Sequence, residues 1–167
     1  MTGQTKRATG AGRLTVTFVC TGNICRSPMA EVIARDAVGS AGLEDRVELI
    51  SCGMGGWHVG DGADHRALSE LADHGYDGSS HRASQFSDRD RHADLVVALD
   101  RGHVRQLTGA GVNPDRIRLL RSFDPDALEG AEVADPYYGT PEDFRITREQ
   151  IEAAMPGFVR WCQTQLA

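Results

Sequence analysis

The sequence predicts an α/β protein: a three-layer sandwich in which helices flank a four-stranded parallel sheet. Short apolar, β-branched runs alternate with longer amphipathic segments along the 167 residues, a pattern typical of parallel sheets covered on both faces. The composition, with 40% hydrophobic and 25% charged residues, is ordinary for a globular protein. Because a chain of this length usually forms one domain, we expect a single domain over residues 14–167.

The first predicted strand spans residues 14–19, a run of apolar and β-branched side chains. A helix is expected soon after it, with Ser27 as its N-cap and Pro28 at its first position, where the missing N–H costs nothing. Residues 47–51 then resemble a second strand. Residues 64–74 have the pattern of a helix and precede a glycine that can end it.

The second half of the chain repeats this alternation. Residues 94–99 form the clearest buried strand, followed by a helix over 102–110 and a fourth strand over 116–120. Pro156 lies within the last predicted helix and should kink or split it, because proline removes a backbone hydrogen bond and crowds the preceding turn. The amphipathic pattern of that helix consists of Ile151, Met155, Phe158, Cys162 and Leu166.

Charge and composition exclude several classes of partner. The net charge of −6 argues against a protein that binds nucleic acid through a broad basic surface. No apolar run approaches the ~20 residues of a membrane span, so we expect neither nucleic acid nor a membrane as partner. Residues 1–13 carry three basic side chains and no acidic one, and they lack the apolar core of a secretory signal. They are predicted to be a disordered N-terminal tail.

The four cysteines, Cys20, Cys25, Cys52 and Cys162, are too sparse for a disulfide framework and include no CxxC pair. Their spacing relative to the histidines matches no common zinc site. We therefore expect no metal and no cofactor, and a monomer in the reducing cytoplasm. Cys52 and Cys162 are interpreted as core residues.

The segment that carries the chemistry joins the first strand to the first helix and contains Cys20, five further residues, and Arg26. The backbone N–H groups of such a loop can point inward, and the helix adds its positive end. Gly22 allows a backbone shape that a side chain would block, and Arg26 can hold two phosphate oxygens through its planar guanidinium. This phosphate-binding loop favours a Cys20 thiolate, and Ser27 is placed to donate a hydrogen bond to the sulfur.

Residues 19–31, Val-Cys-Thr-Gly-Asn-Ile-Cys-Arg-Ser-Pro-Met-Ala-Glu, resemble the signature of the low-molecular-weight protein tyrosine phosphatases. A second family element, Asp-Pro-Tyr-Tyr, begins at Asp135, 115 residues after Cys20, and the resemblance covers residues 14–166. It implies hydrolysis of phosphotyrosine in proteins through a cysteinyl-phosphate, with inorganic phosphate as product. Cys20 would be the nucleophile, Arg26 the phosphate-binding group and Asp135 the general acid and base.

The resemblance also implies roles for residues around these three. Ser51 and His81 would support Asn23, which shapes the loop. Ile24 favours tyrosine, because the arginine phosphatases of this fold typically have threonine at that position. Whether Cys25 forms a protective disulfide with Cys20 stays open. The expected phosphate and ring contacts are Thr21, Gly22, Asn23, Ile24, Cys25, Ser27, Trp57, Tyr137 and Tyr138.

One lysine against 17 arginines is typical of a GC-rich bacterial genome, and we expect a member of the actinobacterial type; some bacterial relatives are exported without a signal peptide. Asp124 and Asp126 are rival carboxylates, interpreted as turn residues. His58 is interpreted as a surface residue, and His103 gives no functional signal.

Two other functions could use a loop of this kind. A thiol-coupled arsenate reductase would need two further cysteines in a mobile segment, and residues 75–91 contain none. A non-catalytic phosphate-binding module would be expected to lack the nucleophile or the acid, and this chain has both.

Overall fold

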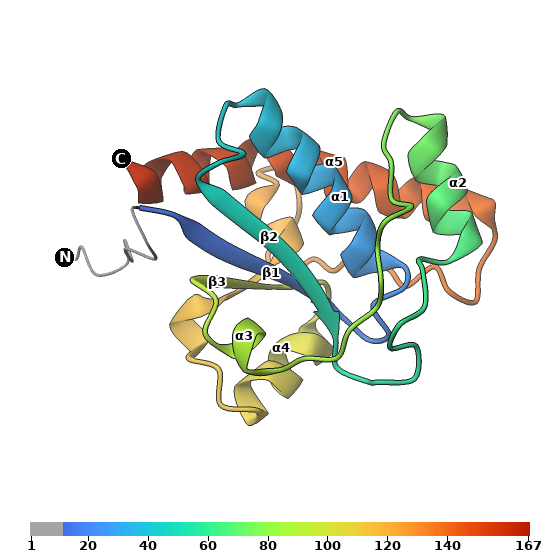
Figure 1. Cartoon of the computed structure of the whole chain (residues 1–167), viewed down its shortest axis with the longest axis horizontal. Helices are drawn as coiled ribbons and strands as arrows, with labels where there is room; N and C mark the ends of the chain where they lie inside the picture. The colour runs from blue at the N-terminus through green and yellow to red at the C-terminus, as the bar shows by residue number, and fades with distance from the viewer. Residues whose placement is uncertain (1–11) are drawn as a thin grey trace.

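The computed structural model describes residues 12–167 (Figure 1); the predicted tail lies almost wholly outside this range. Four parallel strands form one sheet in the order β2-β1-β3-β4. They are β1 (Leu14–Cys20), β2 (Val47–Gly53), β3 (Leu95–Ala98) and β4 (Ile117–Leu119). This arrangement confirms the predicted four-stranded parallel sheet, and each strand agrees with its predicted position to within two residues.

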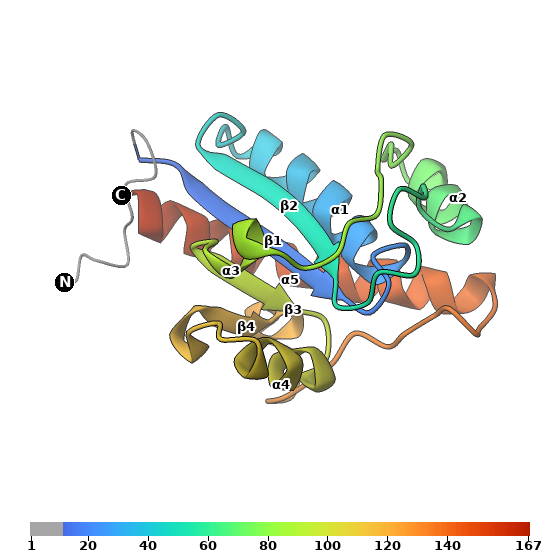
Figure 2. The same cartoon turned by 60° about the horizontal axis from the view of Figure 1, so that its bottom comes forward.

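Helices cover both faces of this sheet (Figures 1 and 2). One face carries α1 (Arg26–Ser40) and α5 (Pro141–Leu166), with α2 (His65–Asp73) packed against α5. The other face carries α3 (Asp88–Arg91) and α4 (Arg101–Gly109). The predicted three-layer sandwich is therefore confirmed. Single 3-10 turns over Pro114–Arg116 and Leu120–Phe123 flank β4.

The two faces of β1 explain the two cores. Val16 and Phe18 are fully buried in the larger core beneath α1 and α5, while Val19 is buried in the smaller core beneath α4. Such burial on both faces is why the strands read as continuous apolar runs. At the end of the strands, Cys20 lies beside Gly53 of β2, so the first loop emerges at the carboxyl edge of the sheet, where α/β folds place their binding sites.

Two helix predictions need correction. Helix α1 begins at Arg26 with Cys25 at its N-cap position, so Ser27 does not cap it; the Ser27 hydroxyl is used elsewhere, as described below. Helix α5 is not split by Pro156 but is one continuous helix. The proline ring lies on the exposed side, and Gly157 packs so closely on Phe123 that an added Cβ would lie 2.1 Å from the Phe123 carbonyl oxygen. Tertiary packing therefore holds the helix together across the missing hydrogen bond.

Within residues 12–167, no helix is both long enough and apolar enough to cross a lipid bilayer.

Candidate active site

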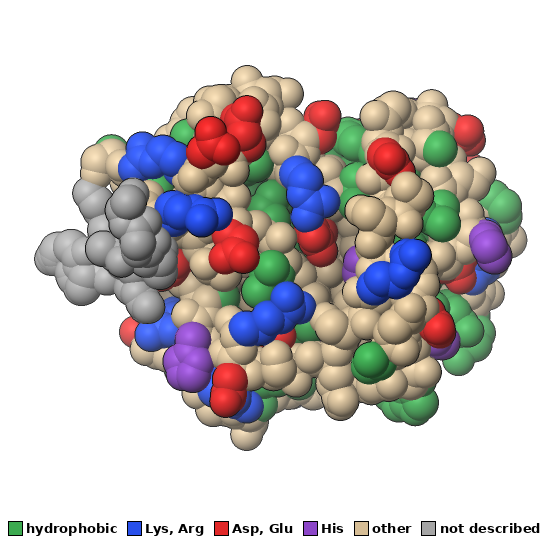
Figure 3. Space-filling view, viewed as in Figure 1, with side chains coloured by type: hydrophobic (Ala, Val, Ile, Leu, Met, Phe, Trp, Pro, Cys, Tyr) green, Lys and Arg blue, Asp and Glu red, His purple; other side chains and the backbone are tan. Residues whose placement is uncertain are grey.

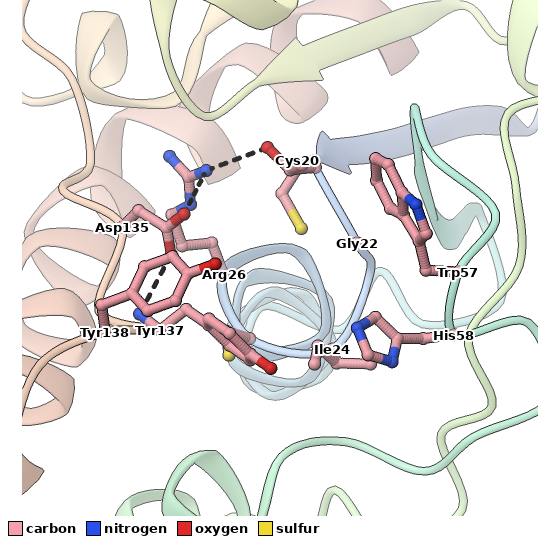
Figure 4. A pocket seen from close by; sticks show the side chains of 11 residues that line it. Cys20, Gly22, Ile24, Arg26, Trp57, His58, Asp135, Tyr137 and Tyr138 are labelled. Carbon is pink, nitrogen blue, oxygen red and sulfur yellow. Dashed lines mark hydrogen bonds and ion pairs between the residues drawn. The ribbon is translucent and has the colours of Figure 1, made fainter.

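A cavity of about 430 Å³ opens where β1 runs into α1 (Figure 4). The loop between these elements forms its floor, and the segment after β2 and the segment before α5 form its walls. It brings together most of the residues that the sequence singled out. The lining residues are Cys20, Thr21, Gly22, Ile24, Cys25, Arg26, Trp57, His58, Asp135, Tyr137 and Tyr138.

Asn23 determines the shape of the loop. Among the described residues it is the only non-glycine with a left-handed backbone, at a φ of 60°, a conformation that asparagine tolerates better than most residues. Its side-chain amide donates to Ser27 Oγ at 2.7 Å and to Ser51 Oγ at 3.0 Å. Its side-chain oxygen accepts from the Ser84 amide at 2.8 Å, and His81 Nε2 lies 2.7 Å from its backbone carbonyl oxygen. The structure thus places Ser51 and His81 against Asn23 and adds Ser84.

Cys20 Sγ lies at the bottom of the cavity, 3.0 Å from Ser27 Oγ and 3.3 Å from the backbone nitrogen of Asn23. Because Ser27 Oγ accepts a hydrogen bond from Asn23, its own proton can point at the sulfur. Behind the loop, an added Cβ on Gly53 would lie 2.8–2.9 Å from backbone atoms of the loop. The close approach of β2 therefore requires glycine at this position.

The Arg26 guanidinium is buried and held by four groups. Nη1 donates to Asp100 Oδ2 at 2.8 Å and to the Val133 carbonyl at 3.0 Å. Nη2 lies 3.5 Å from Thr21 Oγ1 and 3.5 Å from Asp135 Oδ2. The side chain is therefore fixed on one edge by Asp100 and Val133, while its other edge faces the cavity.

Asp100 and His103 form a capping pair at the start of α4. The His103 amide donates to Asp100 Oδ1 at 3.0 Å, and the Asp100 amide donates to His103 Nδ1 at 3.2 Å. Burial alone would raise the pKa of Asp100, but hydrogen bonds from Arg26 and the His103 amide hold it below its usual value. Burial lowers the pKa of His103 to about 4 despite the neighbouring Asp100 carboxylate.

His103 also reaches the loop between β1 and α1. Its Nε2 lies 3.0 Å from Thr21 Oγ1. Because Nδ1 accepts from the Asp100 amide, Nε2 carries the proton of the neutral ring and donates it to Thr21. The buried, neutral His103 thus links the carboxyl end of β3 to the loop between β1 and α1.

Asp135 stands on the opposite wall, with about half of its side chain exposed. Its Oδ1 accepts from the Tyr137 amide at 3.1 Å, and its other oxygen faces Arg26. Arg66 at the start of α2 holds this segment by donating to the carbonyls of Tyr137 at 2.9 Å and Gly139 at 3.1 Å. Asp64 in turn fixes Arg66 through hydrogen bonds near 3.0 Å. The position of Asp135 therefore depends on α2.

Aromatic and apolar side chains form the rim of the cavity. Trp57 is 75% exposed and Tyr138 is 94% exposed, and both line the mouth of the cavity, where clustered exposed apolar side chains mark a ligand or partner site. The rings of Tyr137 and Tyr138 stand edge to face with centroids 4.8 Å apart. Ile24 lies between them and His58 at the mouth (Figure 4). A planar aryl group has apolar walls on both sides here.

The four cysteines are free and buried. Burial, reinforced by the Asp64 carboxylate and by Cys20, raises the pKa of Cys25, and burial likewise raises the pKa of Cys162 to about 12. These two thiols therefore stay protonated at neutral pH. Among the described residues, no cluster of three or more His, Cys, Asp or Glu side chains is arranged to hold a metal ion.

The sequence analysis assigned no role to several residues of the site. Asp100 directly follows the most clearly predicted strand, and a carboxylate at the carboxyl end of a central parallel strand is a signal that could have identified it. His103 follows it at capping-box spacing. No comparable signal pointed to Arg66. His58, interpreted from the sequence as a surface residue, lines the cavity.

The comparisons with known proteins agree with this geometry. The family described as "Low molecular weight phosphotyrosine protein phosphatase" matches residues 15–167. "Low molecular weight protein-tyrosine phosphatase A" of Mycobacterium tuberculosis (strain ATCC 25618 / H37Rv) is 50% identical over 155 residues, which is 92% of this chain and 94% of that protein.

Two solved structures from Bacillus subtilis are also similar. That of YfkJ has a TM-score of 0.83 at 32% identity and covers 93% of this chain and 98% of its own. That of a mutant of the arginine phosphatase YwlE, with a phosphorylated active-site serine, has a TM-score of 0.80 at 26% identity and covers 90% and 96%. The chain belongs to the low molecular weight phosphotyrosine protein phosphatases, a family of hydrolases with a cysteine nucleophile.

Proposed function

We propose that Cys20, Arg26 and Asp135 together remove the phosphate from phosphotyrosine in proteins. One observation carries these roles: a buried thiol that faces the Ser27 hydroxyl and a loop amide shares its cavity with a fixed guanidinium and an accessible carboxylate. These are the nucleophile, the anion-binding group and the proton donor that the reaction needs.

In the first step, the Cys20 thiolate attacks phosphorus while Arg26 and the loop amides hold the three non-bridging oxygens. The bond from phosphorus to the tyrosine oxygen breaks, and Asp135 transfers its proton to that oxygen. The products of this step are a cysteinyl-phosphate, free tyrosine in the protein and an Asp135 carboxylate.

In the second step, the Asp135 carboxylate takes a proton from water as the water oxygen attacks phosphorus. The sulfur–phosphorus bond breaks, inorganic phosphate forms, and Cys20 leaves as a thiolate. Ser27 stabilises that leaving group through the 3.0 Å contact between Oγ and Sγ. Because Arg26 and the N-terminal end of α1 supply the positive charge, turnover is expected to persist in EDTA.

The substrate is proposed to be phosphotyrosine rather than phosphoarginine. Ile24 offers an apolar side chain at the mouth of the cavity, and the rings of Trp57 and Tyr137 lie on its other sides. A phenyl ring gains from burial against these surfaces, whereas a guanidinium would lose hydrogen bonds to water there. The exposed rim residues supply surface for the surrounding protein chain.

The positions of the remaining cysteines support hydrolysis over the arsenate reductase alternative. Cys52 is buried in the core beneath α4, and Cys162 is buried in the core beneath α1 and α5. The sheet separates them, so they offer no thiol relay to Cys20. Four free cysteines also support the proposal that the protein works in a reducing compartment such as the cytoplasm.

The direct test is hydrolysis of p-nitrophenyl phosphate and of a phosphotyrosyl peptide by the purified protein, with and without EDTA. We expect turnover in both buffers, and no turnover by Cys20→Ser. Full activity of Cys20→Ser would contradict the proposed nucleophile. Cys162→Ser is the matched control, because it removes a buried thiol that lies outside the cavity, and it should retain activity.

A further inference from the structure

A second cavity, of about 320 Å³, is lined in part by the residues that hydrogen-bond to Asn23. It shares no lining residue with the active-site cavity. Three arginines line it: Arg35 from α1, Arg89 from α3, and Arg82 from the segment between α2 and α3. Figure 3 shows basic side chains over this face of α1, β2 and the segment that leads to α3.

The charge inside this cavity is positive although the chain as a whole carries −6. Three guanidinium groups face a single lining carboxylate, that of Glu31. Glu31 pairs with Arg35 and also accepts a hydrogen bond from Ser51 Oγ at 2.6 Å. Arg89 in turn lies 3.6 Å from the buried Asp90 carboxylate through its Nε. Arg82 is therefore the lining arginine that has no carboxylate partner among residues 12–167, and its charge can attract an anion.

The arginines retain donors for a ligand. Arg82 donates through Nη1 to the backbone carbonyls of His81 at 2.7 Å and Ser79 at 3.4 Å, and it has no carboxylate partner among residues 12–167. Arg89 uses Nη2 on the Ser51 carbonyl and on Ser84 Oγ, at 2.9 and 3.0 Å. A guanidinium has five N–H donors, so each keeps unused donors at the cavity.

We propose that this second cavity binds a phosphate group, either free phosphate or the phosphate of a small phosphorylated molecule. A phosphate has enough oxygens to accept from several guanidinium groups at once, and its negative charge complements Arg82 and the unused donors of Arg89. The neutral lining residue Ser80 fits the same ligand, because its hydroxyl group can donate to a phosphate oxygen.

This site is built onto the support of the catalytic loop. Ser51, His81 and Ser84 line the second cavity, and each is also hydrogen-bonded to Asn23. A ligand in the cavity therefore contacts the same side chains that hold the loop in its phosphate-binding shape. Occupation of the second site should shift the amide signal of Asn23, even though Asn23 itself does not line the cavity.

The experiment is a titration of the ¹⁵N-labelled full chain with inorganic phosphate, at constant ionic strength adjusted with sodium chloride. The amide signals of residues 80–84 should shift with a Kd for phosphate that differs from the Kd given by residues 21–26 of the loop between β1 and α1. Arg82→Gln should raise the Kd at residues 80–84 about tenfold, because it removes a charged donor. It should leave the competitive Ki of phosphate against p-nitrophenyl phosphate within about twofold of wild type.

Arg160→Gln is the matched control, since Arg160 is an exposed arginine of α5 that lines neither cavity, and it should change neither constant. The proposal is overturned if the amide shifts of residues 80–84 give the same Kd as those of the loop and this Kd does not change in Arg82→Gln, because there would then be only one phosphate site. It is also overturned if acetate at equal ionic strength shifts the signals of residues 80–84 as much as phosphate does. A titration with O-phosphoserine distinguishes free phosphate from a small phosphorylated molecule as the ligand. If O-phosphoserine binds with a lower Kd than inorganic phosphate, the site is assigned to phosphorylated molecules. If its Kd is equal or higher, the site is assigned to free phosphate.

Discussion

The Asp135 carboxylate lies 3.5 Å from the Arg26 guanidinium, so the proposed proton donor and the proposed phosphate-binding group already meet before substrate enters. An entering phosphate must share Arg26 with this carboxylate. Asp100 and Val133 hold the other edge of the guanidinium, and they keep Arg26 in place when Asp135 turns to the leaving group. Proton transfer and phosphate binding can therefore be separated by substitution.

Asp135→Asn should lower kcat for phosphotyrosine about 10²–10⁴-fold, because it removes the proton donor. The Ki for inorganic phosphate should stay the same or fall, since a negative charge next to Arg26 is lost. Steady-state kinetics with phosphate as inhibitor provide both numbers. Asp126→Asn, in the exposed turn after Asp124, is the control. Equal losses in kcat and in phosphate binding would contradict the assignment.

Ser27→Ala should slow the second step more than the first, because the hydroxyl contacts the sulfur that departs in that step. Loss of one hydrogen bond to a charged group, about 1.5–3 kcal/mol, predicts a decrease in kcat of about 10- to 100-fold. Rapid-quench experiments should show a burst of p-nitrophenol and accumulated cysteinyl-phosphate. A uniform slowing without a burst would instead place the effect on the attack by Cys20.

Ile24→Thr should shift selectivity from phosphotyrosine toward phosphoarginine. The change replaces apolar contact with the aryl ring by a hydroxyl group, and differences of this size are worth about 1–3 kcal/mol in selectivity. We expect the ratio of kcat/KM for the two substrates to fall about tenfold or more. Ile24→Val keeps the apolar character and serves as the control. An unchanged ratio in Ile24→Thr would show that selectivity arises elsewhere on the rim.

Arg66→Ala should lower kcat/KM for aryl phosphates about tenfold while leaving the Ki of inorganic phosphate unchanged. Arg66 touches the carbonyls of Tyr137 and Gly139 but no residue of the loop that binds phosphate. Its loss should therefore loosen the segment that carries Asp135 and one wall of the cavity. Arg145→Ala, which removes an exposed arginine of α5, is the comparison. A parallel loss of phosphate binding would indicate general damage to the fold.

His103 should make the protein less stable as the pH falls from 6.5 toward 4. The pKa of His103 is about 4 in the folded protein against an ordinary 6.5, so between these values the unfolded chain binds a proton that the folded protein does not. At about 1.4 kcal/mol for each unit, the free energy of unfolding falls by about 3 kcal/mol across this window. Urea denaturation at several pH values measures it.

His103→Gln should remove this part of the pH dependence, because glutamine does not titrate. His92→Gln is the matched control, since His92 is exposed. If the free energy of unfolding changes with pH equally in wild type and His103→Gln between pH 4 and 6.5, the assignment of a buried neutral His103 is wrong.

The strands and the catalytic loop were predictable because their signals are local. Apolar, β-branched runs such as residues 14–19 indicate buried strands without knowledge of their neighbours, and Cys20 and Arg26 lie within one short segment. The start of α1 was predicted wrongly because Ser27 suits two roles, and its contact with Cys20 excludes it from the cap. Only the folded loop shows which of the two it takes.

The supporting residues could not be predicted in the same way because they come from distant parts of the chain. Arg66 precedes the segment that it holds by about 70 residues, and Ser84 reaches Asn23 from a segment without periodic pattern. The four residues of α3 are likewise too few to show helical periodicity. Such contacts follow from the sheet order, which sequence patterns alone do not fix.

The glycine at the end of β2 has a consequence for which substitutions this protein tolerates. Any side chain at Gly53 would press on the backbone that surrounds the Cys20 sulfur, although Gly53 has no side chain to bind phosphate or to react. We expect a scan of single substitutions to find position 53 almost as intolerant as Cys20 itself, with variants that fold but do not turn over. The width of the anion-binding loop is thus set by the neighbouring strand, at a position where a side chain is missing.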